Sequence, residues 1–129
     1  ESAETEATVI ADHVFKDAGV AREDIDVLFL YDHFTPLVLM ALEEYGFCGR
    51  GMGKDFISDG CLRWPNGALP LNTSGGNLSE GYIHGMQNNI EAVRQLRGHS
   101  HCQVEGAQHA FVAAGNGIAT TAMILRREY

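Results

Sequence analysis

Residues 25–46, "IDVLFLYDHFTPLVLMALEEYG", predict a β-strand, a short turn and an α-helix in succession. Apolar side chains fall on both faces of residues 25–31, which is typical of a central, buried strand. The helix is expected to have Thr35 as its N-cap and Pro36 as its first residue, because these residue types are preferred there. Gly46 is expected to end the helix. This pattern indicates an α/β fold.

The turn between this strand and this helix holds Tyr31, Asp32 and His33. Functional groups gather at the carboxyl ends of strands in α/β folds, so the turn is a candidate part of a functional site. Asp32 is interpreted as a cap of the following helix or as a group that orients a neighbour. Tyr31 ends a buried strand, so it also fits the description of a core tyrosine with a bonded hydroxyl.

Further helices and strands are expected on both sides of this unit. Glycine-rich residues 46–69 predict an irregular functional loop around a short helix. The Asn-Gly pair within "GNG" at 115–117 predicts a hairpin turn. Their order predicts a mixed β-sheet covered by helices. The other expected elements are helices at 3–18, near 54–58 and at 82–97, and two strands within 103–125.

Size and charge restrict the classes of function. The chain has 129 residues and a formal net charge of −8, so residues 1–129 are expected to form one domain that binds neither nucleic acid nor anionic membranes. No apolar run is long enough to cross a bilayer. The three cysteines lack paired spacing, which favours reduced thiols in the cytoplasm. Because the chain starts inside a helical pattern and without methionine, it is interpreted as a piece of a longer polypeptide.

One cluster of potential metal ligands occurs in the sequence. Cys102 lies close to His99 and His101. A zinc site needs a second pair of ligands at a suitable spacing, and the chain has none. We therefore expect no metal site.

Residues 71–86, "LNTSGGNLSEGYIHGM", have the spacing of a glycine-rich active-site loop that runs into a helix. Tyr82 is expected at or just before the amino end of that helix. There the helix dipole would favour a phenolate. The loop's Ser74, Gly75 and Gly76 are consistent with a tight turn, and also with backbone amides that face a substrate oxygen.

Three stretches in the same order resemble the carboxyl-terminal half of thiolase-fold enzymes, most of all the lipid-transfer-protein branch. They are "YDHF" (31–34), "SGGNLSEGYIHG" (74–85) and "FVAAGNGIA" (111–119). By this resemblance, Tyr82 occupies the position of the catalytic histidine, and Phe111 occupies that of the acid/base cysteine. Phe111 can transfer no proton, and a tyrosine normally titrates near 10, so thiolase condensation chemistry is expected to be lost.

The two phenols, Tyr31 and Tyr82, are similar to those of actinobacterial steroid side-chain-cleaving aldolases. This resemblance implies retro-aldol cleavage of a CoA thioester with a tertiary β-hydroxyl, giving a ring ketone and propionyl-CoA. Tyr31 and Tyr82 would share the base and acid roles, and no cofactor is implied beyond the CoA of the substrate. The other residues assigned to the site are Asp32, His33, His84 and His109 in supporting or relay roles, and Ser74, Gly75, Gly76, Gly115 and Gly117 in a substrate or oxyanion loop.

Two other functions are compatible with the resemblance. A thiolase-type acyltransferase would need a nucleophilic cysteine outside this chain, and a non-catalytic carrier of lipids or thioesters would bind without turnover. The family further implies a homodimer and a partner with an OB fold and zinc ribbon, from the family named domain of unknown function 35. The loop at 46–69 is a candidate contact for that partner.

Overall fold

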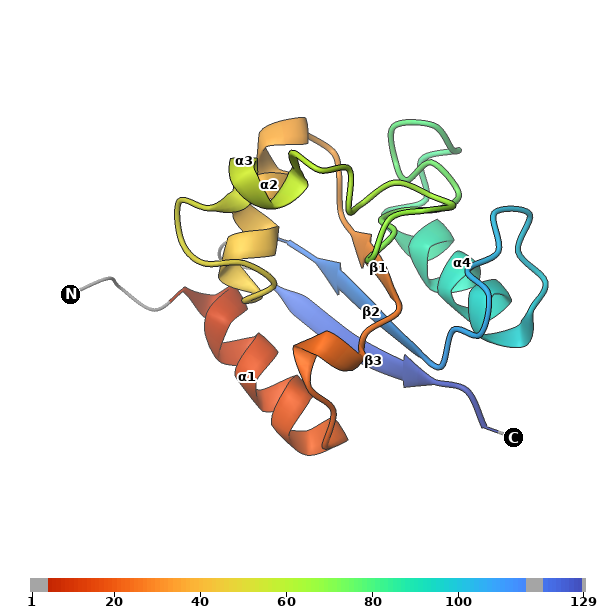
Figure 1. The fold of residues 1–129 in the computed structure, drawn as a ribbon, viewed down its shortest axis with the longest axis horizontal. Helices are drawn as coiled ribbons and strands as arrows, with labels where there is room; N and C mark the ends of the chain where they lie inside the picture. Colours follow the sequence, from red (N-terminus) through yellow and green to blue (C-terminus); the bar gives the residue numbers. More distant parts are fainter. Residues whose placement is uncertain (1–4, 116–119, 129) are drawn as a thin grey trace.

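The computed structural model describes residues 5–115 and 120–128. Figure 1 shows a twisted sheet that runs between α1 on one side and α4 on the other. The mixed sheet covered by helices, predicted from the sequence, is therefore confirmed. The elements are α1 (Glu6–Ala18), a 3₁₀ turn η1 (Arg22–Asp24), β1 (Val27–Leu30), α2 (Thr35–Glu44), α3 (Gly53–Ile57), α4 (Met86–Arg97), β2 (His109–Ala114) and β3 (Thr121–Arg126).

The sheet contains one parallel and one antiparallel pair of strands. β1 pairs with β2 in parallel, and β2 pairs with β3 in antiparallel fashion. The strand order β1-β2-β3 makes β2 the central strand, so the expectation that residues 25–31 form the central strand is wrong. β1 is nevertheless buried on both faces, which explains the apolar pattern. The carboxyl ends of β1 and β2 meet at one edge of the sheet.

The outer side of β1 is covered by a short segment of the chain that ends at Asn72. The amide of Leu28 donates to the carbonyl of Pro70 (2.9 Å), and the Asn72 amide donates to the carbonyl of Leu28 (2.9 Å). The Asn72 side chain then bonds both the amide of Leu30 (3.0 Å) and its carbonyl (2.9 Å). These bonds fix the last residue of β1, and with it the start of the turn at Tyr31.

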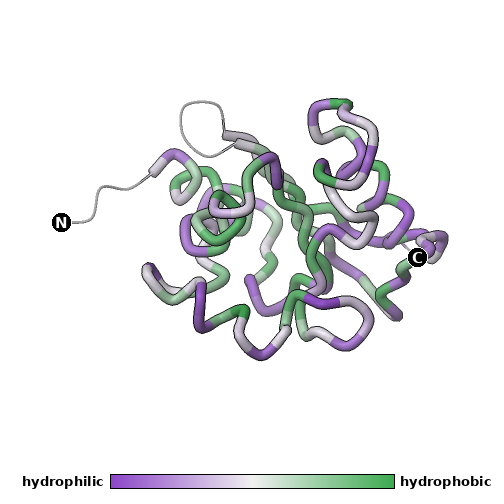
Figure 2. Tube along the Cα trace, turned by 90° about the horizontal axis from the view of Figure 1, so that it is seen from above, coloured by the Kyte–Doolittle hydropathy of each residue, from purple (hydrophilic) through white to green (hydrophobic). Residues whose placement is uncertain are grey.

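Apolar side chains form a core on each face of the sheet. In Figure 2 the hydrophobic residues concentrate along the strands, and hydrophilic residues lie toward the outside. On one face Leu28 and Leu30 pack with residues of α1 and α2. On the other face Val27 and Phe29 pack against α4. The alternation of faces thus holds for these four side chains, whereas Ile25, which it would place beside Val27, packs with Leu28 and Leu30.

The start of α2 differs from the sequence prediction. Phe34 is the N-cap, with extended backbone angles, and Thr35 is already the first helical residue. The predicted Thr35 cap is therefore wrong, and no side chain caps this helix end. The amide of Leu37 donates to the Phe34 carbonyl instead (3.0 Å). The helix ends as predicted, with Gly46 in the left-handed region at φ +78°.

α4 begins at Met86, one turn later than expected. His84 (φ +53°) and Gly85 (φ +84°) both lie in the left-handed region, which a right-handed helix cannot contain. Tyr82 therefore lies in the loop before α4; of the two predicted placements, at the helix end or just before it, the second is the one observed. The helix ends at Gly98 as predicted.

The remaining predictions concern loops. The short helix predicted near 54–58 is confirmed as α3. β2 and β3 are antiparallel neighbours, but Asn116 and Gly117 of the hairpin turn predicted at 115–117 lie outside the described residues. Within the described part of the chain, no helix has the length and apolar composition needed to cross a bilayer.

The ring of Phe111 belongs to the apolar core on the α1 side of the sheet. Its ring is fully buried, stacks on Phe15 (centroids 5.4 Å apart) and meets Tyr45 and Phe47 edge-on. Phe111→Ala should lower the free energy of unfolding by about 3–5 kcal/mol, because it removes a large buried ring. Urea denaturation followed by circular dichroism measures this. Met123→Ala, at an exposed position of β3, is the control and should cost less than about 1 kcal/mol. If both substitutions lowered the free energy of unfolding equally, the importance of the Phe111 ring for the core would be contradicted.

Candidate active site

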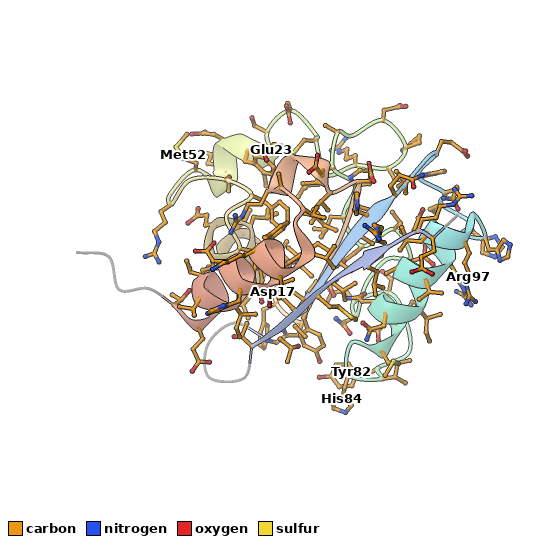
Figure 3. All side chains as sticks on the ribbon, turned by 90° about the horizontal axis from the view of Figure 1, so that it is seen from below. Asp17, Glu23, Met52, Tyr82, His84 and Arg97 are labelled. Atoms are coloured by element: carbon orange, nitrogen blue, oxygen red, sulfur yellow. The ribbon has the colours of Figure 1, made fainter. Side chains whose placement is uncertain are left out.

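Two tyrosine hydroxyls meet beyond the carboxyl end of β1. The hydroxyl of Tyr31 donates a hydrogen bond to the hydroxyl oxygen of Tyr82 at 2.8 Å, across 51 positions of sequence. Tyr82 is 62% exposed, so its oxygen is accessible from outside this chain. In Figure 3 Tyr82 and His84 project outward together beside the first turn of α4, while Arg97 lies at the helix's other end. The structure thus brings together the two predicted phenols.

The hydrogen bond changes the acid–base behaviour of Tyr31. Donation to Tyr82 is the main cause that raises the pKa of Tyr31 above its ordinary value, and partial burial and the nearby charge of Asp32 add to it. Tyr31 therefore remains protonated at neutral pH. Tyr82 lies in the loop before α4 and not within the helix, and its hydroxyl oxygen accepts the hydrogen bond from Tyr31.

Two histidine rings pack against the tyrosines. The His33 ring lies 4.8 Å from the Tyr31 ring and 4.9 Å from the Phe34 ring, measured between centroids. The His84 ring lies 4.8 Å from the Tyr82 ring at 67°. Both predicted supporting histidines are therefore beside the pair, one against each phenol.

A cavity of about 240 Å³ opens next to Tyr31 and His84. It lies between the first turns of α4 and the ends of β2 and β3. Asn88 is 1% exposed and donates its amide to the Leu30 carbonyl (3.3 Å) at the end of β1. The cavity offers space for a small part of a substrate next to the phenol pair. The other lining residues are Gly85, Asn89, Val112, Ala113, Ala114, Thr121, Ala122 and Met123.

Sequence reasoning did not identify the polar residues of α4. The periodic apolar residues Met86, Ile90 and Val93 are exposed (54%, 42% and 37%), and the buried face of the helix instead carries mostly polar side chains. Apolar periodicity therefore indicated the wrong face. A useful signal would have been the run "QNN" at 87–89, since uncharged amides that are buried need internal partners. The buried polar residues of the helix are Gln87, Asn88, Glu91 and Gln95.

Asp32 anchors the glycine-rich loop instead of capping α2. Its carboxylate accepts from the Asn77 backbone amide (2.7 Å) and from the Asn77 side chain (2.9 Å). Of its two predicted roles, helix capping is therefore wrong, and orienting a neighbour is correct. Gly76 passes so close that a Cβ there would overlap the Asp32 carboxylate.

The glycine loop is built as a turn. The Gly75 amide donates to the Asn72 carbonyl (2.7 Å), so the predicted oxyanion role of that amide is wrong. The carbonyl of Gly76 accepts from the amides of Ser79 (3.3 Å) and Glu80 (3.2 Å). Ser74 lies in the same turn. The loop amides thus serve mainly to hold the loop's own shape and to satisfy Asp32.

Behind the loop lies a buried carboxylate that the sequence did not reveal. Glu91 is 4% exposed and accepts from the hydroxyls of Thr73 (3.0 Å) and Ser100. Gln95 donates to Thr73 (2.9 Å) and to the Cys102 carbonyl (2.7 Å). This network ties α4 to the start of the glycine loop and to the segment after the helix.

The predicted supporting role of His109 is wrong. His109 opens β2, whereas Tyr31 follows the carboxyl end of β1, and the two strands are parallel. The residues therefore lie at opposite ends of the sheet, separated by roughly 13–17 Å at about 3.3 Å per residue. The His109 ring instead lies against the Asp24 carbonyl (3.2 Å).

The two glycines predicted near the end of β2 have separate outcomes. Gly115 follows β2 with φ +88°, and its carbonyl accepts from the Tyr45 hydroxyl (3.0 Å). Gly117 lies outside the described residues, so its role stays a prediction. Phe111, at the predicted cysteine position, faces α1 and does not line the cavity. In residues 5–115 and 120–128, no group of three or more potential ligands is arranged to hold a metal ion.

Comparison with known proteins gives one family match. Residues 1–127 match the family model described as thiolase C-terminal domain-like. The chain is 48% identical over 120 residues to the 17-hydroxy-3-oxo-4-pregnene-20-carboxyl-CoA lyase of Mycobacterium tuberculosis, covering 93% of this chain and 31% of that protein. It is also 48% identical over 120 residues to the steroid side-chain-cleaving aldolase of Thermomonospora curvata, covering 93% and 30%.

A solved structure has the same fold. An Ltp2-ChsH2(DUF35) aldolase matches 95% of this chain and 32% of its own, with a TM-score of 0.90 and 48% identity. The chain therefore spans just under a third of the length of these relatives.

Gly76→Ala tests the close approach to Asp32. Gly76 (φ +65°) and Gly106 (φ +74°) both have left-handed backbones, but a Cβ at Gly106 meets no atom within 4 Å. Gly106→Ala should cost about 1 kcal/mol of strain, and Gly76→Ala at least twice that, because the loop must also move. Thermal unfolding of both variants measures the difference. Equal costs would mean that the contact with Asp32 does not constrain the loop.

Proposed function

The chain belongs to the thiolase C-terminal domain-like family, and from this premise we propose that it supplies the tyrosine pair of an aldolase that cleaves a steroid side chain. The predicted family and fold are confirmed by the family match and by the structural likeness. The substrate would be a CoA thioester with a tertiary hydroxyl on its β carbon. The products would be a 17-ketosteroid and propionyl-CoA.

The observation that carries this proposal is the 2.8 Å contact between the hydroxyls of Tyr31 and Tyr82. Tyr82, as the phenolate, removes the proton of the substrate's β-hydroxyl. The bond between the α and β carbons then breaks, leaving a ketone at the β carbon and a thioester enolate. Tyr31 donates its proton to the α carbon. The proton now on Tyr82 returns to Tyr31 along their hydrogen bond, and the pair is restored.

We assign the acid role to Tyr31 and the base role to Tyr82 because Tyr31 is the donor of the hydrogen bond between them. In the resting pair the Tyr31 hydroxyl donates a hydrogen bond to Tyr82 and keeps its proton, because that bond raises the pKa of Tyr31. It is therefore the phenol suited to be the acid, and Tyr82 is the phenol suited to be the base. We propose that His33 and His84 support the pair, because their rings lie against Tyr31 and Tyr82.

Phe111 supports cleavage over a thiolase-type acyl transfer. It occupies the position that the resemblance assigns to the acid/base cysteine, and it is buried in the core. The retro-aldol reaction needs neither that cysteine nor a covalent acyl-enzyme. We propose that CoA enters only as part of the substrate.

The partner proposals rest on the relatives. Because the matched structure is a complex of an aldolase with a DUF35 protein, we propose that this chain works with a partner of the DUF35 family. We also propose that it acts in the cytoplasm, as the carboxyl-terminal domain of a longer polypeptide that forms a homodimer. The length of the relatives supports the longer polypeptide.

Tyr82→Phe should lower the rate of cleavage at least about 10³-fold, because it removes the proposed base. The complete protein is given a β-hydroxy steroid side-chain CoA thioester, and mass spectrometry follows the ring ketone and propionyl-CoA. Tyr45→Phe is the matched control, since its phenol lies in the core and does not line the cavity. Near-normal turnover by Tyr82→Phe would rule out this role. An acylated cysteine without ketone would indicate an acyltransferase instead, and tight binding without turnover would indicate a carrier.

Adding the DUF35 partner should raise turnover about 10-fold or more if it completes or stabilises the site. Size-exclusion chromatography of the mixture, followed by the same product assay, measures association and activity together. Unchanged turnover in a complex that forms would limit the partner to a structural role. Failure to associate would contradict the proposed partnership.

A further inference from the structure

Three buried polar side chains form a chain of hydrogen bonds next to the phenol pair. The Asp32 carboxylate accepts from the Asn77 side-chain amide at 2.9 Å, and the Asn77 side-chain oxygen accepts from the amide of Gln87. The three residues are 7%, 8% and 3% exposed. They come from the turn after β1, the glycine loop and the first turn of α4. One line of side-chain contacts thus joins the three segments that surround the site.

The loop that carries Tyr82 is held at the two ends of this line. Asn77 precedes Tyr82 by five residues, and Gln87 follows it by five. Between them the chain is largely exposed, with Leu78 at 65% and Ile83 at 50%. An exposed loop gains little from packing, so the position of Tyr82 depends on its anchored ends. Asn77 joins both ends to Asp32, the residue directly after Tyr31.

A side-chain amide matches both of these neighbours. Asn77 presents an N–H donor to a carboxylate and a carbonyl acceptor to the Gln87 amide. An aspartate at 77 would place two carboxylates side by side. An alanine would leave the buried Asp32 with only the backbone amide of residue 77, and a buried polar group that loses its partner is costly.

We propose that Asn77 is a positioning residue, which holds the Tyr82 hydroxyl within hydrogen-bonding distance of the Tyr31 hydroxyl by bridging Asp32 and Gln87. Its catalytic consequence rests on the proposed function. The geometric consequence does not, because the hydroxyl contact exists without substrate. Among the described residues the side-chain hydrogen bonds of Asn77 go to Asp32 and Gln87 and not to a phenol, so its proposed action is through the loop.

The titration of Tyr31 reports on this contact directly. The titratable groups that face the pair are the two phenols themselves, His33 against Tyr31, His84 against Tyr82, and Asp32. The strand residues that line the neighbouring cavity do not titrate. Because the bond to Tyr82 is the main cause of the raised pKa of Tyr31, losing the contact should bring this pKa down toward its ordinary value near 10.

The test measures the pKa of Tyr31 in the complete protein labelled with [¹³Cζ]tyrosine, with the signal assigned by Tyr31→Phe. Asn77→Ala should lower this pKa as far as Tyr82→Phe does. The double variant should show no further change, because both substitutions remove the same bond. The control is Asn66→Ala, at an exposed position on a distant loop. The buried Tyr45, whose pKa burial raises to about 12, is an internal reference for an intact core.

A second variant guards against misfolding. Gln87→Met removes the amide that anchors the other end and should lower the pKa of Tyr31 in the same direction. An unchanged Tyr31 pKa in folded Asn77→Ala, or in folded Gln87→Met should the first not fold, would overturn the proposal. So would a further fall in the Asn77→Ala/Tyr82→Phe double variant.

Activity separates the proposal from the function on which it rests. If the wild type cleaves the steroid thioester, Asn77→Ala should lower kcat about 10- to 100-fold with KM changed less than about threefold. If Asn77→Ala shifts the pKa of Tyr31 but the wild type does not cleave the thioester, the positioning role stands and the aldolase function is refuted. Full kcat despite a shifted pKa would restrict Asn77 to structure.

Discussion

The buried carboxylate of Asp32 is the constraint on which the site depends. A charge withdrawn from water needs close donors, and among the described residues both hydrogen bonds to Asp32 come from Asn77. The glycine loop must therefore lie against the end of β1, and only glycine fits at position 76. Tyr31 precedes this carboxylate, and Tyr82 follows the loop. The two phenols thus flank a carboxylate whose hydrogen bonds go to Asn77 and not to either hydroxyl.

The parts of the fold that sequence could predict are those that local chemistry determines. The uninterrupted apolar run from Val27 to Leu30 indicated a strand that is buried on both faces. Gly46 and Gly98 lie in the left-handed region, which ends a right-handed helix. The phenol pair was predicted from the family resemblance, because Tyr31 and Tyr82 replace residues of two separate thiolase motifs. Their direct contact could not be derived, since it depends on how two distant segments pack.

The failed predictions share a cause. The apolar residues at 83, 86, 90 and 93 continue a helical period through the site, but His84 and Gly85 adopt backbones that end it, and no periodicity reveals a dihedral angle. The glycine amides were assigned to substrate before their partners within the turn could be known. His109 was predicted to support the site because it falls on a strand near the glycine turn that starts at Gly115. The parallel direction of β1 and β2 then placed it at the far end.

The Asn72 side chain has a consequence for how the molecule avoids aggregation. An edge strand with free amides and carbonyls can recruit a strand from another molecule and start a fibril. Here the backbone of the segment ending at Asn72 bonds the N–H and the carbonyl of Leu28. The side-chain amide of Asn72 bonds the N–H and the carbonyl of Leu30. A single side chain thus replaces the last residue of a neighbouring strand. The backbone of Leu30, the residue directly before Tyr31, is therefore not available to pair with a strand of another molecule.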